Sequence, residues 1–509
     1  MKVFLMDRDR DLNLQVDLPP NADALMQDLE LNTLLEAMSR GDKFLFDVAK
    51  EVILLSLNDP DAIAYRQEIL SDCLENAAIV REIYGLAVKA FEGEKKVWGF
   101  WKSPGSILNR AVQVLELFVG ILTRLRQIAE EHGGQFRSEG FVRFFAMLAQ
   151  ELDDEYFRVV QEHLSQLEFR DGILMSAELG KGNRGVNYIL RRPLNERRSW
   201  LKRIFSKDRS TYNFEIDGRD ESGHQALSEL RERGIDLVAN ALAQSSDHIL
   251  SFFTMLRTEL GFYVGCLNLH EQLVHKGETT CFPVPLDSDR LALSAQGLYD
   301  VCLTLSLEIR VVGNDLAADN KKLVIITGAN QGGKSTFLRG VGLSYVMMQC
   351  GMFVPAERFS ASVCAGIYTH YKREEDATMK KGKLDEELSR MSGIADYIGP
   401  GCILLCNESF SSTNEREGSE IARQVISALL DAGIRVFLVT HLFELAQGFY
   451  CKRMDAALFL RAERQIDGQR TFRIVEGEPL PTSYGQDLYK EIFGRDGQPA
   501  ATVHLDTQL

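Results

Sequence analysis

The residues with the clearest chemical meaning form a glycine-rich loop between an apolar run and a helical pattern. The apolar run is Leu323–Ile326, and the loop comprises Gly328, Ala329, Asn330, Gln331, Gly332, Gly333, Lys334, Ser335 and Thr336. The spacing G-x-x-x-x-G-K-S after a buried strand lets backbone N–H groups surround a triphosphate at the N-terminus of the next helix. In that arrangement Lys334 contacts the β and γ phosphates and Ser335 ligates Mg²⁺. The alternative, a glycine-rich turn with a chance Lys-Ser, is disfavoured by the strand and helix patterns on its two sides.

A second apolar run ends in polar residues that suit phosphate chemistry. Residues 403–406 are Ile-Leu-Leu-Cys, and Asn407 and Glu408 follow. Phosphate-loop ATPases normally place an Asp at the position of Asn407, and the neutral amide oxygen is a weaker ligand for Mg²⁺ than a carboxylate. Glu408 remains available to orient the attacking water. The alternative is a strand that simply ends in a solvated glutamate.

A third apolar run, 436–439, is followed by Thr440 and His441. If it forms a parallel strand beside the others, the imidazole lies at the same edge of the sheet, where a γ phosphate would bind. A histidine in such a position is more often structural than functional. Its occurrence together with Lys334 and Glu408 favours a catalytic role.

Several elements must surround these residues, since the chain has 509 residues and 45% hydrophobic content, enough for about three domains. Apolar residues at helical spacing predict a helical core over 1–169. Short alternating runs between glycines predict a small strand-containing insertion over 170–221. A proline-free helical pattern from Ser222 to about Lys276 predicts a long-helix lever region over 222–286, and the nucleotide-binding domain occupies 287–509. The predicted fold class is therefore α/β, with a mainly helical region before the ATPase domain.

Charge and cysteine usage limit the classes of function. The net charge of −15 argues against a general affinity for nucleic acid. Nine cysteines without CxxC spacing indicate reduced thiols, and we expect a cytoplasmic protein. No signal peptide or membrane span is expected, which disfavours the ATPase subunit of a transporter.

The predicted insertion is the exception to the acidic balance. Residues 181–209 contain ten Lys and Arg against two acidic residues, with Tyr188, Trp200 and Phe205 among them. This pattern suits contacts to a phosphate backbone with stacking on unpaired bases, although most charge runs are only solvated surface. The candidate nucleic-acid contacts are Arg184, Arg191, Arg192, Arg197, Arg198, Lys202 and Arg203.

The motifs around the three runs resemble those of the MutS family of DNA mismatch-repair ATPases. The family's phosphate loop reads roughly G-P-N-M-G-G-K-S-T, and the loop here reads G-A-N-Q-G-G-K-S-T. Residues 440–445, T-H-L-F-E-L, are similar to the family's T-H-Y-x-E-L. Residues 351–356 and Ser483–Gly485 match the stretch after the loop helix and the closing S-Y-G. The resemblance is strong over about 305–495 and weaker over 25–280.

This resemblance implies a C-terminal ABC-type phosphate-loop ATPase domain behind a helical core and lever region. It implies ATP and Mg²⁺ as ligands, with Lys334, Glu408 and His441 as catalytic residues and Ser335 and Asn407 at the metal. It further implies double-stranded or branched DNA as a partner and a homodimer formed through the ATPase domains. No membrane partner is expected.

The chain also departs from the family pattern. The family's signature segment is close to G-x-S-T-F-x-x-E, whereas residues 382–391 lack the Ser and Thr donors and carry Asp385, Glu386 and Glu387. These acids either alter the contact to a partner's ATP or simply favour the start of a helix through its dipole. The chain opens almost directly into the helical core, so we expect the mismatch-binding and connector domains to be missing.

The sequence therefore predicts an ATP-hydrolysing, MutS-like protein that couples its nucleotide state to DNA binding, in mismatch repair or a related process. Hydrolysis should be slow, because both the metal ligand and the signature donors are altered. The alternative is a slow ATP-gated clamp or scaffold that acts on branched nucleic acid, RNA or a protein partner without recognising mismatches.

Overall fold

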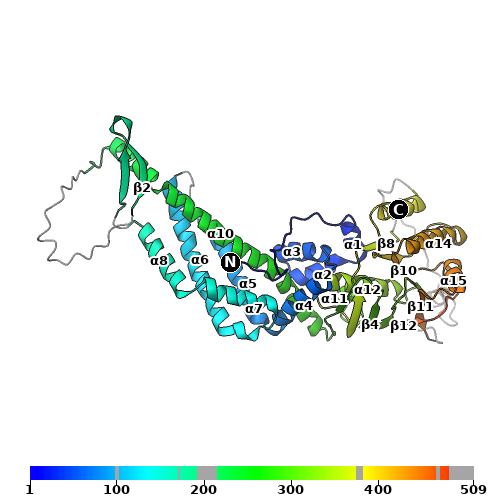
Figure 1. The fold of residues 1–509 in the computed structure, drawn as a ribbon. Coiled ribbons are helices and arrows are strands. Elements are labelled where there is room, and N and C mark those ends of the chain that lie inside the picture. The colour runs from blue at the N-terminus through cyan, green and yellow to red at the C-terminus, as the bar shows by residue number, and fades with distance from the viewer. Residues whose placement is uncertain (98–102, 170–171, 192–214, 374–381, 466–469, 481–509) are drawn as a thin grey trace, which may run out of the picture. The chain divides into compact units, whose positions relative to one another are not determined.

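The computed structural model describes residues 1–97, 103–169, 172–191, 215–373, 382–465 and 470–480 (Figure 1). The chain divides into two compact units. The helical unit consists of Met1–Leu5 and Asn76–Leu260, and the sheet unit consists of Met6–Glu75 and Gly261–Leu509. This division differs from the ranges predicted from the sequence, because most of the first 75 residues join the C-terminal part of the chain.

The helical unit is built from amphipathic helices around one apolar core and carries a β-hairpin. Its elements are α5 (Ala77–Lys96), α6 (Pro104–His132), η1 (Gly133–Gln135), α7 (Glu139–Glu151), α8 (Asp154–Leu167), β1 (Met175–Leu179), η2 (Lys181–Asn183), β2 (Gly185–Leu190) and the first part of α10 (Glu221–His275). The two strands pair antiparallel, with Met175 opposite Leu190. The hairpin lies within the strand-containing insertion predicted over 170–221, of which residues 192–214 are outside the described residues.

Helix α6 shows how the sequence produces this core. Ser103 caps its N-terminus, its side chain and backbone exchanging hydrogen bonds with Ser106, and Pro104 takes the first helical position, where no N–H is needed. By length and composition α6 is apolar enough to cross a membrane. However, many of its apolar side chains are buried. Phe118, for example, packs on Phe253 of α10, with ring centroids 5.5 Å apart. This is the pattern of a core helix in a folded domain.

The sheet unit contains two β-sheets. The six-stranded sheet has the order β12-β11-β6-β10-β9-β8, and the four-stranded sheet has the order β3-β7-β4-β5. The larger sheet is formed by β6 (Leu323–Thr327), β8 (Ile367–Tyr371), β9 (Ile403–Asn407), β10 (Arg435–Val439), β11 (Ala457–Arg464) and β12 (Arg470–Glu476). The smaller sheet is formed by β3 (Val284–Leu286), β4 (Leu293–Leu298), β5 (Asn314–Ala317) and β7 (Arg358–Ser362). The mixed α/β class predicted from the sequence is thereby confirmed.

Helices from both ends of the chain belong to the sheet unit. They are α1 (Ala22–Asp28), α2 (Leu31–Ser39), α3 (Lys43–Leu54), α4 (Pro60–Glu75), α11 (Val301–Ser306), α12 (Lys334–Gln349), α13 (Lys383–Ala395), α14 (Glu415–Asp431) and α15 (Phe443–Cys451). Polar side chains join the early part of the chain to the C-terminal end of α12. Arg66 donates hydrogen bonds to the carbonyls of Met6 and Cys350, and the Gln349 side chain donates to Leu57 O at 3.0 Å.

The order and register of the large sheet decide where the candidate residues lie. Strand β10 runs parallel to both of its neighbours, with Val439 opposite Ile326 of β6 and Asn407 of β9. All three strands therefore end at one edge of the sheet. The loops after β6, β9 and β10, which carry the three predicted motifs, begin side by side there.

Candidate nucleotide-binding site

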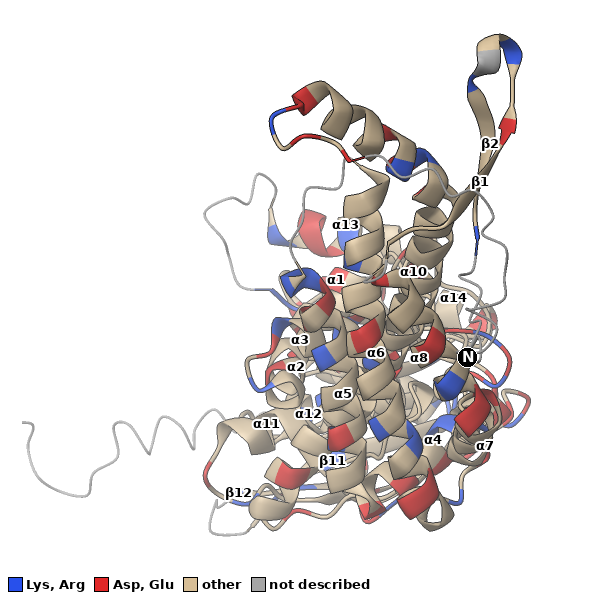
Figure 2. Cartoon of the chain, turned by 90° about the vertical axis from the view of Figure 1, so that its left-hand side faces the viewer, with Lys and Arg blue, Asp and Glu red and all other residues tan. Residues whose placement is uncertain are grey.

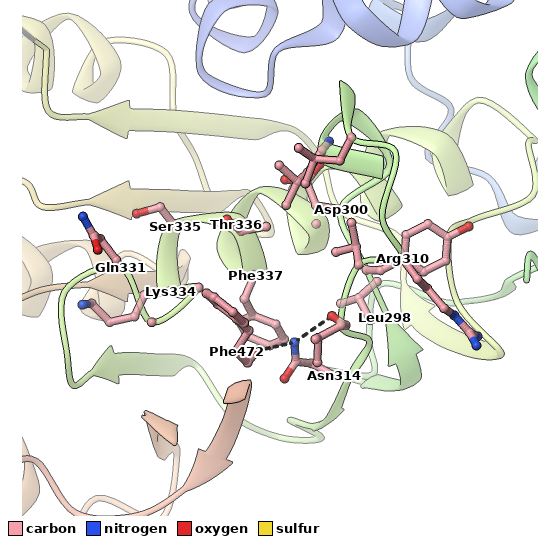
Figure 3. A pocket seen from close by; sticks show the side chains of 18 of the residues that line it. Leu298, Asp300, Arg310, Asn314, Gln331, Lys334, Ser335, Thr336, Phe337 and Phe472 are labelled. Atoms are coloured by element: carbon pink, nitrogen blue, oxygen red, sulfur yellow. Dashed lines mark hydrogen bonds between the residues drawn. The ribbon is translucent and has the colours of Figure 1, made fainter. Parts of the chain in front are cut away.

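A pocket of ≈ 710 Å³ opens at this edge of the sheet (Figure 3). Its lining comes from the loop and helix residues 330–337, from Glu408, from Phe472 and from side chains between 298 and 314. Most of the predicted phosphate loop and the predicted water-orienting glutamate thus line one cavity. Its size is within the range of small-molecule sites in proteins.

The glycines of the loop are required by its backbone conformation. Gly328 has a φ of 109° and Gly333 a φ of 88°, values that side chains with a Cβ rarely adopt. A Cβ on Gly328 would also lie 2.9 Å from the backbone nitrogen of Ala462. Gly333 is the N-cap of α12, so the loop leads directly into a helix N-terminus, where free N–H groups favour an anion.

Lys334 lies at the start of α12 with only 5% of its surface exposed. Its Nζ donates hydrogen bonds to Gly328 O at 2.9 Å and to Ala329 O at 2.8 Å. Burial lowers the pKa of the ammonium, and the nearby Glu408 carboxylate partly opposes this shift. The loop carbonyls therefore hold the lysine within the pocket.

Ser335 and Asn407 form the candidate metal position. The Ser335 hydroxyl donates to Asn407 Oδ1 at 2.9 Å, so two neutral oxygens from α12 and β9 lie next to each other. Hydroxyl and amide oxygens are acceptable Mg²⁺ ligands, and Mg²⁺ on a nucleotide is usually completed by phosphate oxygens and water. Within the described ranges, no group of three or more His, Cys, Asp and Glu side chains could hold a metal ion by itself. The residues fit a metal that arrives with its nucleotide.

Glu408 and His441 lie beside each other at the ends of β9 and β10. The distance between His441 Nδ1 and Glu408 Oε1 is 3.9 Å, and both side chains are about one-third exposed. Glu408 has a φ of 53°, and its backbone N–H donates to Val439 O at 2.9 Å. Glu408 lines the pocket, whereas His441 is outside its lining. The imidazole is therefore placed to act on the carboxylate more directly than on a bound phosphate.

Phe472, which the sequence analysis did not single out, closes one side of the pocket (Figure 3). Its ring is 49% exposed and comes from β12. The buried Asn314 side chain fixes this strand, because Nδ2 donates to Phe472 O at 3.3 Å and Oδ1 accepts from Ile474 N at 2.6 Å. No spacing pattern marks Phe472, since the contact to Asn314 joins residues that are 158 positions apart.

The pocket wall also contacts the end of α10. The Lys276 side chain donates to Leu307 O at 2.7 Å, and Arg310 lies 3.6 Å from the buried carboxylate of Glu278. Leu307 and Arg310 both line the pocket. The C-terminal end of the longest described helix is thus connected to the nucleotide pocket by hydrogen bonding and charge.

The altered signature stretch, 382–391, begins α13. Gly382 is its N-cap, and Asp385 and Glu386 occupy the first turn, where the helix dipole favours acids. Glu387 is buried and accepts a 2.9 Å hydrogen bond from Ser412, in the loop after Glu408. Two lysines that precede this helix, Lys380 and Lys381, lie outside the described residues.

Only part of the candidate nucleic-acid surface is described. Arg184 lies at the end of the exposed turn between β1 and β2, where Figure 2 shows basic residues. Arg191 follows β2 and donates from Nε to Ser176 Oγ at 2.9 Å. The remaining candidates, which lie outside the described residues, are Arg192, Arg197, Arg198, Lys202 and Arg203.

Comparisons with known proteins find matches to both parts of the chain. The family model of the MutS2 N-terminal domain matches residues 58–276, and that of MutS domain V matches residues 324–493. MutS protein homolog 4 of Mus musculus is 26% identical over 243 residues, which cover 47% of this chain and 25% of that protein. The DNA mismatch repair protein MutS of Thermus aquaticus is 30% identical over 307 residues, which cover 59% of this chain and 35% of that protein. The chain thus spans only part of the length of these relatives.

A glycine loop between a buried strand and a helix, together with polar ends on the two adjacent strands, defines a phosphate-loop nucleotide-binding domain. The two family models cover this domain and most of the helical region before it. The chain is therefore a member of the MutS-like family of mismatch-repair proteins, and the resemblance noted in the sequence is confirmed.

Proposed function

We propose that this protein binds and hydrolyses ATP with Mg²⁺ and couples its nucleotide state to the binding of DNA. The observation that carries this proposal is the register of β6, β10 and β9. It brings Lys334, Ser335, Asn407 and Glu408 to one edge of the large sheet. The resemblance to mismatch-repair proteins supports DNA as the partner.

The phosphate chain of ATP would bind the loop amides at the start of α12, with Lys334 on the β and γ phosphates. Ser335 and Asn407 would hold the metal ion, which when bound neutralises charge on the phosphate oxygens. Glu408 orients the attacking water, and the His441 imidazole holds the Glu408 carboxylate in position. The Phe472 ring offers a flat apolar surface on which the adenine can stack.

The DNA contact is proposed for the hairpin of the helical unit and the basic stretch after it. Arg184 and Arg191 supply positive charge there, and α10 begins beyond this stretch and ends at the nucleotide pocket. A homodimer through the ATPase domains and a cytoplasmic location complete the proposal.

The test is ATP hydrolysis by the full chain in the presence of different nucleic acids. Homoduplex, mismatched and branched DNA and RNA would be compared for binding and for stimulation of hydrolysis, at about 50 and about 200 mM salt. Stimulation by DNA, with binding that weakens as salt rises, supports the proposal. Hydrolysis without binding to any nucleic acid would instead support a scaffold for a protein partner, and failure to bind ATP would overturn the nucleotide site.

Replacing Asn407 with Asp tests the origin of slow hydrolysis. We expect N407D to raise the rate of hydrolysis by about tenfold, because a carboxylate is a stronger Mg²⁺ ligand than an amide. Asn320→Asp, on an exposed turn outside the pocket, is the matched control. Steady-state hydrolysis at several Mg²⁺ concentrations measures the effect, and an unchanged rate with unchanged Mg²⁺ dependence would show that Asn407 does not limit turnover.

A further inference from the structure

A buried histidine connects the loop that carries Glu408 to helix α13. His370 lies in β8 and has no exposed surface. Its Nδ1 is 2.7 Å from Ser409 Oγ, and its Nε2 is 3.0 Å from Glu387 O. Its ring also stacks on Phe410, with centroids 5.5 Å apart and an interplanar angle of 24°. One side chain thus contacts the catalytic loop and the signature-equivalent helix.

The hydrogen bonds define the protonation of this imidazole. Burial lowers the pKa of His370 to about 4, with Arg390 acting in the same direction, so the ring is neutral at pH 7. A carbonyl oxygen only accepts hydrogen bonds, so the single ring proton is on Nε2 and is donated to Glu387 O. Nδ1 is then an acceptor. Ser409 Oγ lies 2.7 Å from two acceptors of the same residue, the His370 carbonyl and His370 Nδ1, and its single proton is shared between them.

The loop held by these bonds has an unusual backbone. Glu408 and Phe410, on either side of Ser409, have φ values of 53° and 60°, in the left-handed region that non-glycine residues rarely adopt. Such residues are strained and persist where surrounding contacts hold them. Ser412 adds a second connection to α13 through the Glu387 carboxylate at 2.9 Å. The orientation of Glu408 therefore depends on contacts made by its neighbours in the loop.

We propose that His370 is a positioning residue for ATP hydrolysis, which holds the Glu408 loop in its working conformation and fixes that loop to α13. The inference rests on the proposed function, because it assigns a role around the same Glu408. His370 should affect the rate of hydrolysis more than the affinity for nucleotide. It should affect this rate through its contact with Ser409.

The test compares His370→Phe with Tyr368→Phe. Phenylalanine at 370 keeps a ring against Phe410 but loses both hydrogen bonds. Tyr368 lies two residues earlier in β8 and donates from its hydroxyl to Tyr397 O, near the end of α13, at 3.3 Å. Y368F therefore removes a hydrogen bond between the same strand and the region of the same helix without touching the loop after β9.

We expect H370F to lower the single-turnover rate of ATP hydrolysis by about 10²-fold, since displacing a reacting group by about 1 Å has an effect of that size. The Kd for ATP should stay within about twofold of wild type, and His370→Asn, whose amide oxygen can still accept from Ser409, should recover part of the rate. Y368F should hydrolyse ATP at nearly the wild-type rate. Equal losses in H370F and Y368F, or a loss of ATP binding equal to the loss of rate, would overturn the proposal.

A double-mutant cycle tests the route through Ser409. Ser409→Ala should slow hydrolysis, and adding it to H370F should have little further effect, because both changes remove the same hydrogen bond. If the double variant instead loses the product of the two single-variant losses in rate, His370 does not act through Ser409. Thermal unfolding of each variant identifies any that fail to fold, and His370→Asn then provides the comparison. A wild-type chain without ATPase activity would contradict the proposed function, whereas an active wild type with an equally active H370F would contradict only this inference.

Discussion

Lys334→Met is expected to reduce ATP hydrolysis by about 10³-fold and to weaken ATP binding, because it removes the ammonium that stabilises charge on the transferred phosphoryl group. Methionine retains most of the apolar stem, so the fold should persist. The two carbonyls that Lys334 contacts, Gly328 O and Ala329 O, belong to the loop that leads into the pocket. Single-turnover hydrolysis and titration with a fluorescent ATP analogue measure the two effects.

Lys321→Met is the matched control for this variant. Lys321 also donates to a backbone carbonyl, Asp455 O at 2.6 Å, but this hydrogen bond is exposed to solvent and the residue lies outside the pocket lining. Its replacement should leave hydrolysis and binding unchanged. A K334M protein that hydrolyses ATP within tenfold of wild type would show that the loop does not use its lysine in catalysis.

Arg435→Met is expected to destabilise the sheet unit by about 3 kcal/mol, because several buried acceptors lose their donor. Arg435 is 4% exposed at the start of β10. Its guanidinium donates to the carbonyls of Lys321, Ala318 and Ala292. Ala292 precedes β4 and Ala318 follows β5, both in the smaller sheet, and Lys321 lies just before β6 of the larger sheet. One side chain of β10 thus connects the two sheets.

Urea unfolding followed by far-UV circular dichroism measures this loss, with Arg423→Met as the control. Arg423 is an exposed residue of α14 that pairs with Glu420 at 2.6 Å. Exposed ion pairs contribute little to stability, so the control should unfold at nearly the wild-type urea concentration. Equal midpoints for the two variants would show that the guanidinium contacts of Arg435 contribute no more than a surface ion pair.

Much of the nucleotide site could be predicted because its residues follow local patterns. The glycine loop with Lys334, the residue Asn407 and the pair Thr440 and His441 each follow a short apolar run, and parallel strands bring the ends of such runs to one edge. The sequence does not state the strand order. The placement of β10 between β6 and β9 is a property of long-range pairing, and it puts His441 beside Glu408.

Other parts of the site could not be predicted, because they depend on contacts between distant residues. Phe472 lines the pocket through β12, a strand with no motif of its own. His370 resembles any other residue of an apolar strand until its neighbours from α13 and the β9 loop are in place. The domain ranges were predicted from changes in local pattern along the chain, which carry no information on the contact of Arg66 with Cys350.

The interrupted course of the chain has a consequence for its synthesis. Residues 6–75 are synthesised before the rest of the sheet unit, and partners such as Ile367, to which Asn21 donates a hydrogen bond, follow hundreds of residues later. The helical unit is nearly contiguous over 76–260 and can fold before the later partners of α1 to α4 have been synthesised. A fragment that begins near residue 287 would lack these helices and expose an uncovered edge at β8, which invites aggregation. An ATPase fragment for expression should therefore retain residues 6–75, joined to residue 261 by a linker that replaces the helical unit.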